Sequence, residues 1–268
     1  MKLMTEVQIA PAPFTIEPCE QMLFVGSCFA DYMGKRFAAE KFRTLINPYG
    51  VMYNPASLWH TVGRCADFTP RVSVLTLGTN RVYRLRETGE IVDNCQKRPA
   101  KLFEEEPLSL SDCVCYLSQS IDSLLSRHPE ARVVLTVSPV RYAKYGFHGS
   151  RLSKAVLLLA VDQAVQKYGE KVSYFPAYEL MNDELRDYRF YAADMLHPSE
   201  QAVDYIFQRF ADTYFSAATK EFLVRWKPLK EALAHRPFRP ESPEHRHFME
   251  QVNQSIALLS QQYPDFEL

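Results

Sequence analysis

The sequence predicts an α/β protein in which a mainly parallel sheet of five strands is covered by helices on both faces. Five short apolar runs recur along the chain, and most of them are separated by segments with helical periodicity. Turn-forming residues such as glycine, proline, serine and asparagine follow these runs. Apolar runs of this kind are typical of strands that are buried on both faces, as the strands of parallel sheets are.

The composition limits the classes of partner and cofactor that we expect for this protein. The chain has 268 residues, 47% of them hydrophobic and 24% charged, with a formal net charge of −1. This is ample material for a core, and the lack of a basic stripe argues against nucleic acid or membrane partners. Without an 18-residue apolar run or a secretion signal, we expect a cytoplasmic protein. The six cysteines form no CxxC pair and no zinc spacing, so we expect reduced thiols, no metal and no cofactor.

The first strand and helix meet at a single serine. After an extended, proline-rich stretch (1–21), the strand 22–25 ends at Gly26, and a helix continues to about residue 41. Ser27 lies in its first turn, where unpaired backbone N–H groups favour developing negative charge. The alternative is that Ser27 merely caps the helix. Cys28 has no feature that lowers a thiol pKa and is interpreted as a small buried residue.

The middle of the chain adds strands and helices. We expect strands at 42–46 and 72–77, helices at 55–66 and 109–127, and a hairpin at 81–85 and 91–92. The turn formers Asn47-Pro48-Tyr49-Gly50 and Gly78-Thr79-Asn80 follow the two strands. Residues 94–107 contain two prolines and three consecutive glutamates, which is typical of a long surface loop.

The last third completes the sheet and adds an extension. The expected elements are strands at 132–137 and 172–175, a helix at 151–168 and a core helix beginning at Pro198. A charged loop (181–193) leads to Asp194 and His197. Beyond about residue 218, helices at 223–234 and 245–262 predict a C-terminal extension. We therefore divide the chain into a core domain (1–218) and an extension (219–268) that packs on the core or on a partner.

The strand ends bring together residue types suited to covalent catalysis. A serine hydroxyl needs a base to take its proton, and the imidazole of that base needs a carboxylate to orient it. Because parallel strands end at one edge of a sheet, Ser27, Asp194 and His197 can meet there. The alternative is that Asp194 and His197 only cap the helix that follows.

Further candidates would stabilise an oxyanion or bind substrate. The oxyanion candidates are the backbone N–H groups of Ser27 and Gly50 and the side-chain amide of Asn80. The substrate-binding candidates follow the strand 132–137 and are Arg141, Tyr142 and His148. A solvated loop explains this second group equally well.

Several motifs in order resemble one family. Gly26-Ser27-Cys28-Phe29-Ala30 matches the motif that names the GSCFA domain family, a branch similar to the SGNH/GDSL hydrolases. Further stretches that resemble it are 47–55, 76–79, 136–141, 186–191 and 194–198. The resemblance implies a flavodoxin-like three-layer α/β/α fold. It also implies that Ser27 takes the nucleophile position and that Asp194 and His197 take the two positions of a DxxH block.

The resemblance implies a serine-dependent ester hydrolase, with a short acyl group on a carbohydrate or small molecule as the substrate. An acyltransferase would use the same residues, and an idle binding or scaffold module is the alternative from another class. The sequence departs from the SGNH pattern at two places. Gly26 precedes the serine where GDSL has aspartate, and Arg81 follows Asn80 where GxND has aspartate. Asn47, Asn54 or Asn94 are alternatives for the oxyanion asparagine.

Overall fold

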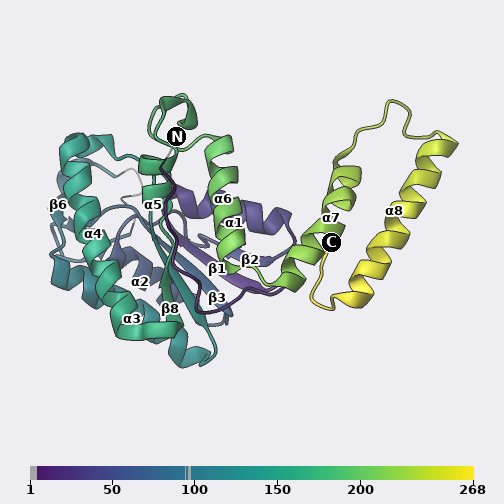
Figure 1. Ribbon diagram of the computed structural model, residues 1–268. Helices are drawn as coiled ribbons and strands as arrows, with labels where there is room; N and C mark the ends of the chain where they lie inside the picture. The colour runs from purple at the N-terminus through teal and green to yellow at the C-terminus, as the bar shows by residue number, and fades with distance from the viewer. Residues whose placement is uncertain (1–4, 94, 96–97) are drawn as a thin grey trace.

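The computed structural model describes residues 5–93, 95 and 98–268. Its centre is a five-stranded sheet in the order β2-β1-β3-β7-β8, in which every neighbouring pair is parallel. The strands are β1 (Gln21–Gly26), β2 (Arg43–Ile46), β3 (Val72–Leu77), β7 (Arg132–Val137) and β8 (Val172–Tyr174). Counted along the chain, these five strands have the order 2-1-3-4-5, which is flavodoxin-like. The predicted fold class is confirmed (Figure 1).

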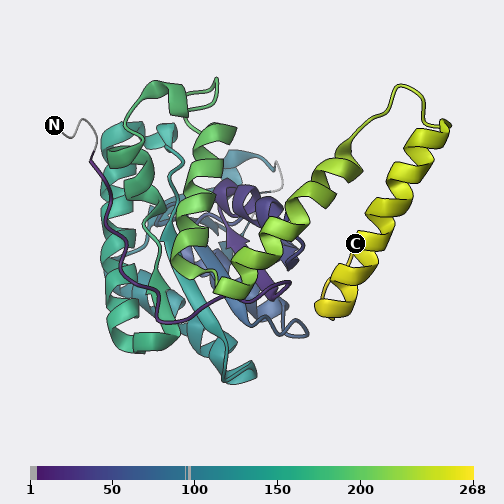
Figure 2. The same ribbon diagram turned by 45° about the vertical axis from the view of Figure 1, so that its right-hand side comes forward.

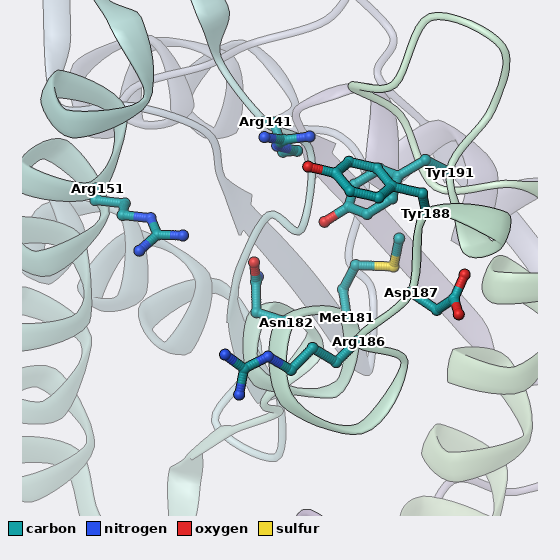
Figure 3. A pocket seen from close by; sticks show the side chains of 8 residues that line it. All are labelled: Arg141, Arg151, Met181, Asn182, Arg186, Asp187, Tyr188 and Tyr191. Atoms are coloured by element: carbon teal, nitrogen blue, oxygen red, sulfur yellow. The ribbon is translucent and has the colours of Figure 1, made fainter.

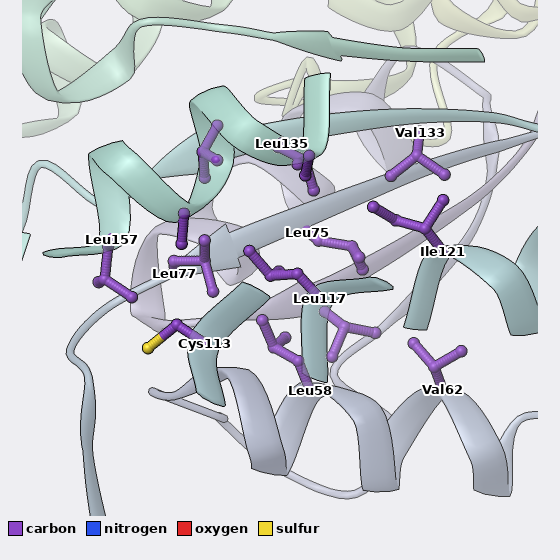
Figure 4. Packing of buried hydrophobic residues seen from close by; sticks show 14 of the residues in the cluster. Leu58, Val62, Leu75, Leu77, Cys113, Leu117, Ile121, Val133, Leu135 and Leu157 are labelled. Atoms are coloured by element: carbon purple, nitrogen blue, oxygen red, sulfur yellow. The ribbon is translucent and has the colours of Figure 1, made fainter. Parts of the chain in front are cut away.

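Helices cover both faces of this sheet and form two cores. The helices of one face are α1 (Cys28–Ala39) and α6 (Glu200–Tyr214), and those of the other are α2 (Pro55–Arg64), α3 (Leu110–Arg127) and α4 (Gly146–Tyr168). Along β1, Met22 and Phe24 pack against the first pair while Leu23 and Val25 pack against the second group, as the period of two in a strand requires. Figure 4 shows the second core, where Leu75 and Leu77 of β3 meet residues of α2 and α3.

Short helical segments join the main elements. They are 3₁₀ turns at Ala100–Leu102, Ala143–Tyr145, Gly169–Lys171 and Tyr188–Phe190, and α5 (Ala177–Glu179), which continues into a π-helical turn at Leu180–Glu184. The π-helical turn at Leu180–Glu184 and the 3₁₀ turn at Tyr188–Phe190 lie in the charged segment that precedes Asp194. This segment is therefore not a plain loop but a chain of short turns over the end of the sheet.

A second, antiparallel sheet corrects the prediction for residues 94–107. Its order is β5-β4-β6, with strands β4 (Arg81–Leu85), β5 (Ile91–Val92) and β6 (Phe103–Pro107). We expected a surface loop because of the consecutive glutamates. In the structure the backbone of β6 pairs with β4, and Glu104 and Glu106 form ion pairs with arginines of β4 and the residue after it. Cross-strand charge pairs make such a polar edge strand acceptable.

Gly26 is required where β1 gives way to α1. Its φ is +149°, and a Cβ at this position would lie 2.1 Å from the carbonyl oxygen of Thr76 on β3. A side chain here would therefore push apart two central strands. The backbone N–H of the next residue, Ser27, donates to that same Thr76 oxygen at 3.2 Å.

The C-terminal helices α7 (Ala217–Ala234) and α8 (Pro243–Gln262) form a hairpin beside the core (Figures 1 and 2). Trp226 of α7 donates from Nε1 to the carbonyl of Ala39, and Lys230 pairs with Glu40 at 2.5 Å, so the hairpin packs on the end of α1. The helix begins at Ala217 instead of 223, because Ser216 caps it. The boundary at 218 stays a prediction, since α7 runs through it. Among the described residues no helix is long and apolar enough to cross a membrane.

Candidate active site

Ser27 is the N-cap of α1 and is 2% exposed. Its Oγ accepts a hydrogen bond from the backbone N–H of Phe29 at 3.3 Å and donates one to Oγ of Ser138 at 2.8 Å. The serine therefore does cap the helix, as the simpler interpretation has it. Its second bond, to a serine 111 residues away at the end of β7, is not part of a cap.

Asp194 and His197 form a hydrogen-bonded pair. Nδ1 of His197 lies 2.5 Å from Oδ2 of Asp194, and the other oxygen, Oδ1, accepts the backbone N–H groups of Leu196 and His197 at 2.9 and 3.0 Å. These backbone donors first, and the imidazole second, lower the pKa of Asp194 to about 2. The carboxylate is thus ionised near neutral pH and only accepts. Nδ1 must carry the proton, which leaves Nε2 of His197 as a free acceptor.

Ser27 and His197 line one cavity of about 260 Å³. The other residues that line it are Cys28, Tyr53, Gly78, Ser138, Val140, Arg141, Tyr142, Ala143, Lys144 and Leu196. Within the part of the chain that the structure describes, the Ser27 hydroxyl bonds to Ser138 and not to His197. The Ser27 hydroxyl proton is therefore directed at Ser138 in this arrangement.

Two of the three predicted substrate-binding residues reach this cavity. Arg141 and Tyr142 line it, and Arg141 also ties the β7 exit to the Asp194 segment by donating to the carbonyls of Leu196 and Met195 at 3.0 and 3.1 Å. His148 is exposed in the first turn of α4 and is not among the lining residues. The helix begins at Gly146, earlier than the sequence suggested, and carries His148 outward with it.

The structure places each predicted oxyanion donor in another hydrogen bond. The Ser27 N–H donates to Thr76, the Gly50 N–H to the carbonyl of Asn47 at 2.8 Å, and Nδ2 of Asn80 to the carbonyl of Leu108 at 2.7 Å. Gly50 and Asn80 do not line the Ser27 cavity. Asn80 instead holds the start of β4 against the residue that follows β6.

The alternative asparagines are also engaged. Oδ1 of Asn47 accepts the N–H of Gly26 at 2.8 Å and its Nδ2 donates to Asp31 at 2.5 Å, while Oδ1 of Asn54 caps α2 by accepting from Ser57. Asn94 lies outside the described residues. Asn47 thus fixes the turn that presents Ser27 without facing the cavity itself.

Sequence reasoning missed a buried lysine behind the serine pair. Nζ of Lys154 on α4 donates to the carbonyl oxygen of Ser138 at 2.7 Å, and the residue is 2% exposed. Burial lowers the pKa of Lys154 to about 7. The signal was present, because Lys154 falls at the helical spacing of the apolar face formed by Leu157 and Val161.

Cys28 borders the cavity without the properties of a nucleophile. Burial raises the pKa of its thiol, so the thiolate is disfavoured, and the weak contact with the Tyr53 hydroxyl spans 4.0 Å. All six cysteines are free. Among the described residues, no group of three or more His, Cys, Asp or Glu side chains converges as a metal site would.

The molecule is thus a flavodoxin-like α/β/α protein with a serine and an aspartate–histidine pair around one cavity. Residues 21–71 and 68–210 match the model of the GSCFA family, and 226–268 match that of the GSCFA domain protein, C-terminal domain. The chain belongs to the GSCFA family. No curated protein matches it by sequence.

Similar solved structures include three lipolytic or carbohydrate esterase proteins. A family 3 carbohydrate esterase from Clostridium thermocellum is 14% identical, with 77% of this chain and 98% of that chain covered and a TM-score of 0.43. A member of the lipolytic protein G-D-S-L family from Veillonella parvula is 13% identical, with 72% and 97% covered and a TM-score of 0.47. A carbohydrate esterase family 3 protein from Talaromyces cellulolyticus is 9% identical, with 72% and 95% covered and a TM-score of 0.43.

Proposed function

We propose that the protein is a serine-dependent ester hydrolase that acts on a short acyl group carried by a carbohydrate or another small molecule. The observation that carries this proposal is the hydrogen bond between Asp194 and Nδ1 of His197, which frees Nε2 beside a cavity that Ser27 also lines. The cavity of about 260 Å³ supports a short acyl group.

The reaction follows from these positions. Oγ of Ser27 bonds to the ester carbonyl carbon while Nε2 of His197 takes the hydroxyl proton, and the ionised Asp194 stabilises the imidazolium. The alcohol leaves with the proton from His197, which gives an acyl-enzyme. Water then loses a proton to Nε2 while its oxygen bonds to the acyl carbon. The bond between that carbon and Oγ breaks, and Oγ takes the proton back from Nε2 as the acid leaves.

The predicted oxyanion donors are all engaged in other hydrogen bonds, but two other donors at the cavity support an oxyanion. The N–H of Cys28, the first residue of α1, has no helical carbonyl four residues before it. The hydroxyl of Ser138 accepts from Ser27 and from the N–H of Val140, which leaves its own proton to donate. We infer that these two groups stabilise the negative oxygen, with the N-terminal end of α1 adding to the effect.

A fluorophosphonate probe tests the proposal, since it labels only activated serines. The intact protein should be labelled on Ser27, and Ser27→Ala and His197→Ala should each abolish labelling while leaving the fold unchanged by circular dichroism. Ser255→Ala, on the exposed part of α8, is the matched control and should label like the wild type. A folded wild type that does not label would overturn the proposal and favour a binding module.

A further inference from the structure

A second cavity of about 300 Å³ lies beside the Ser27 cavity, and Arg141 lines both. Its other lining residues are Arg151, Met181, Asn182, Arg186, Asp187, Tyr188 and Tyr191 (Figure 3). They come from α4, from the π-helical turn and from the segment that leads to Asp194. The same chain segment therefore builds the wall of this cavity and positions the candidate base.

The cavity concentrates positive charge. Three of its lining side chains are guanidinium groups, and the single carboxylate, Asp187, accepts the N–H of Arg189 at 2.9 Å and forms an ion pair with the same residue. Within the described residues, neither Arg151 nor Arg186 has a salt-bridge partner. Like charges facing one hollow repel each other, and a bound anion would remove that cost.

Arg141 is held in place at the junction of the two cavities. Its Nη1 bonds to the carbonyl of Met195, and its guanidinium lies 4.0 Å from the ring centre of Phe147 and 5.3 Å from that of Tyr191. The centre of the Tyr188 ring lies 6.0 Å from the same guanidinium, and Figure 3 shows both tyrosine rings beside Arg141. A guanidinium fixed by such packing loses little freedom when it binds a ligand.

The positive charge at the cavity also affects the pKa of Tyr191. Burial raises the pKa of its hydroxyl, and the guanidinium groups of Arg141 and Arg151 work against that rise. The two arginines come from different elements, yet both lie near this one ring.

We propose that this second cavity binds an anionic group, a carboxylate or a phosphate, on the same substrate whose ester lies at Ser27. Planar guanidinium groups recognise both of these anions through paired N–H donors. The inference rests on the proposed function for the position of the ester, but not for the binding of the anion. It defines the substrate class as acylated acidic sugars or similar small acids.

Equilibrium binding tests the anion site without any turnover. The intact protein would be titrated in a calorimeter with methyl glucuronide, methyl glucoside 6-phosphate and neutral methyl glucoside. We expect the wild type to bind at least one of the two anions about tenfold or more tightly than the neutral sugar, and the two anions separate carboxylate from phosphate recognition. The double variant Arg151→Gln/Arg186→Gln should lose this preference. Arg246→Gln, at an exposed arginine of α8 outside the cavity lining, should keep it.

Kinetics then link the two cavities. The measured quantity is the ratio of kcat/KM for acetate esters of the preferred anionic sugar and of the neutral sugar. This ratio should exceed one in the wild type, fall toward one in the double variant, and fall with added salt. Equal binding of all three sugars, or an unchanged preference in the double variant, would overturn the anion site while probe labelling of Ser27 still supports a hydrolase. Anion binding without labelling of Ser27 would instead overturn the proposed hydrolase activity and still support the anion site.

Discussion

Ser27 and His197 border the same cavity, but the structural elements that carry them differ. Ser27 is buried at the end of a central strand, and its neighbours Thr76 and Ser138 lie in β3 and directly after β7. His197 is 29% exposed on a segment of short turns, and Asp194, which orients it, is 46% exposed. The sheet therefore positions the proposed nucleophile. The proposed base is oriented by Asp194, three residues away, on a segment that Arg141 ties to the end of β7.

Because of this difference, substitutions near Ser27 and substitutions near His197 should affect folding stability and catalysis differently. A change on the Ser27 side disturbs β1, which lies between β2 and β3, and should cost folding free energy as well as activity. A change on the His197 side removes no buried contact of the sheet and should cost activity alone. Variants on the two sides of the cavity test this contrast.

The largest effect is expected from Asp194→Asn. The amide still accepts the N–H groups of Leu196 and His197, but it no longer fixes the proton on Nδ1 or stabilises the imidazolium, so kcat should fall about 10³-fold or more. The melting temperature should not change, because the side chain is exposed. Asp183→Asn, an exposed carboxylate of the same part of the chain, is the control and should keep full activity. Equal loss in both variants would show that the segment acts as a whole.

Gly26→Ala tests the buried half of the site. The added methyl meets the carbonyl oxygen of Thr76 at 2.1 Å, and the positive φ adds backbone strain, so we expect a loss of about 3 kcal/mol in the free energy of unfolding. Gly63→Ala is the matched control, because its Cβ meets no atom within 4 Å and it lies in helix α2. That variant should be stabilised by about 0.5–1 kcal/mol. Urea unfolding of both proteins measures the difference, and a neutral Gly26→Ala would contradict the tight β1–β3 approach.

Where local pattern and topology agree, the structure brings predicted site residues to one cavity. The strand, Gly26 and the helix that follows identify Ser27, and the parallel order of the strands brings its turn to the same edge as the Asp194 segment. Asn80 was predicted as an oxyanion donor because it follows a strand end in a GxN pattern. Its amide instead serves Leu108, a residue that only the β4–β6 pairing brings near.

Charged residues were the main source of error in the fold. Glutamates 104–106 suggested a loop, since a single sequence does not show that arginines 84 and 86 lie across from them. The sequence analysis did not single out Lys154, although the helical period of α4 places it on the buried face. In both cases the partner that makes the charge acceptable lies far away in the sequence.

The smallest effect concerns this buried lysine under Ser138. The pKa of Lys154 in the folded protein is about 7, against 10.5 for an ordinary lysine, because burial disfavours the charged form. Below pH 7 both the folded and the unfolded chain hold the proton, and folding bears the full cost of burying the charge. Between about pH 7 and 10.5 the unfolded chain keeps a proton that the folded protein has lost, so the contribution of Lys154 to stability rises with pH by about 1.4 kcal/mol per pH unit.

Lys154→Met isolates this slope from all other titrating groups. Removing the amine also removes the hydrogen bond to the Ser138 carbonyl, but that loss shifts stability by a nearly constant amount, while the slope disappears. Urea unfolding at pH 7, 8 and 9 would show the wild type gaining stability relative to the variant with each step. The exposed Lys35→Met control should run parallel to the wild type. If stability depends on pH in the same way for Lys154→Met and the wild type, the lysine keeps its proton in the folded protein. A permanent positive charge would then lie next to the Ser138 carbonyl.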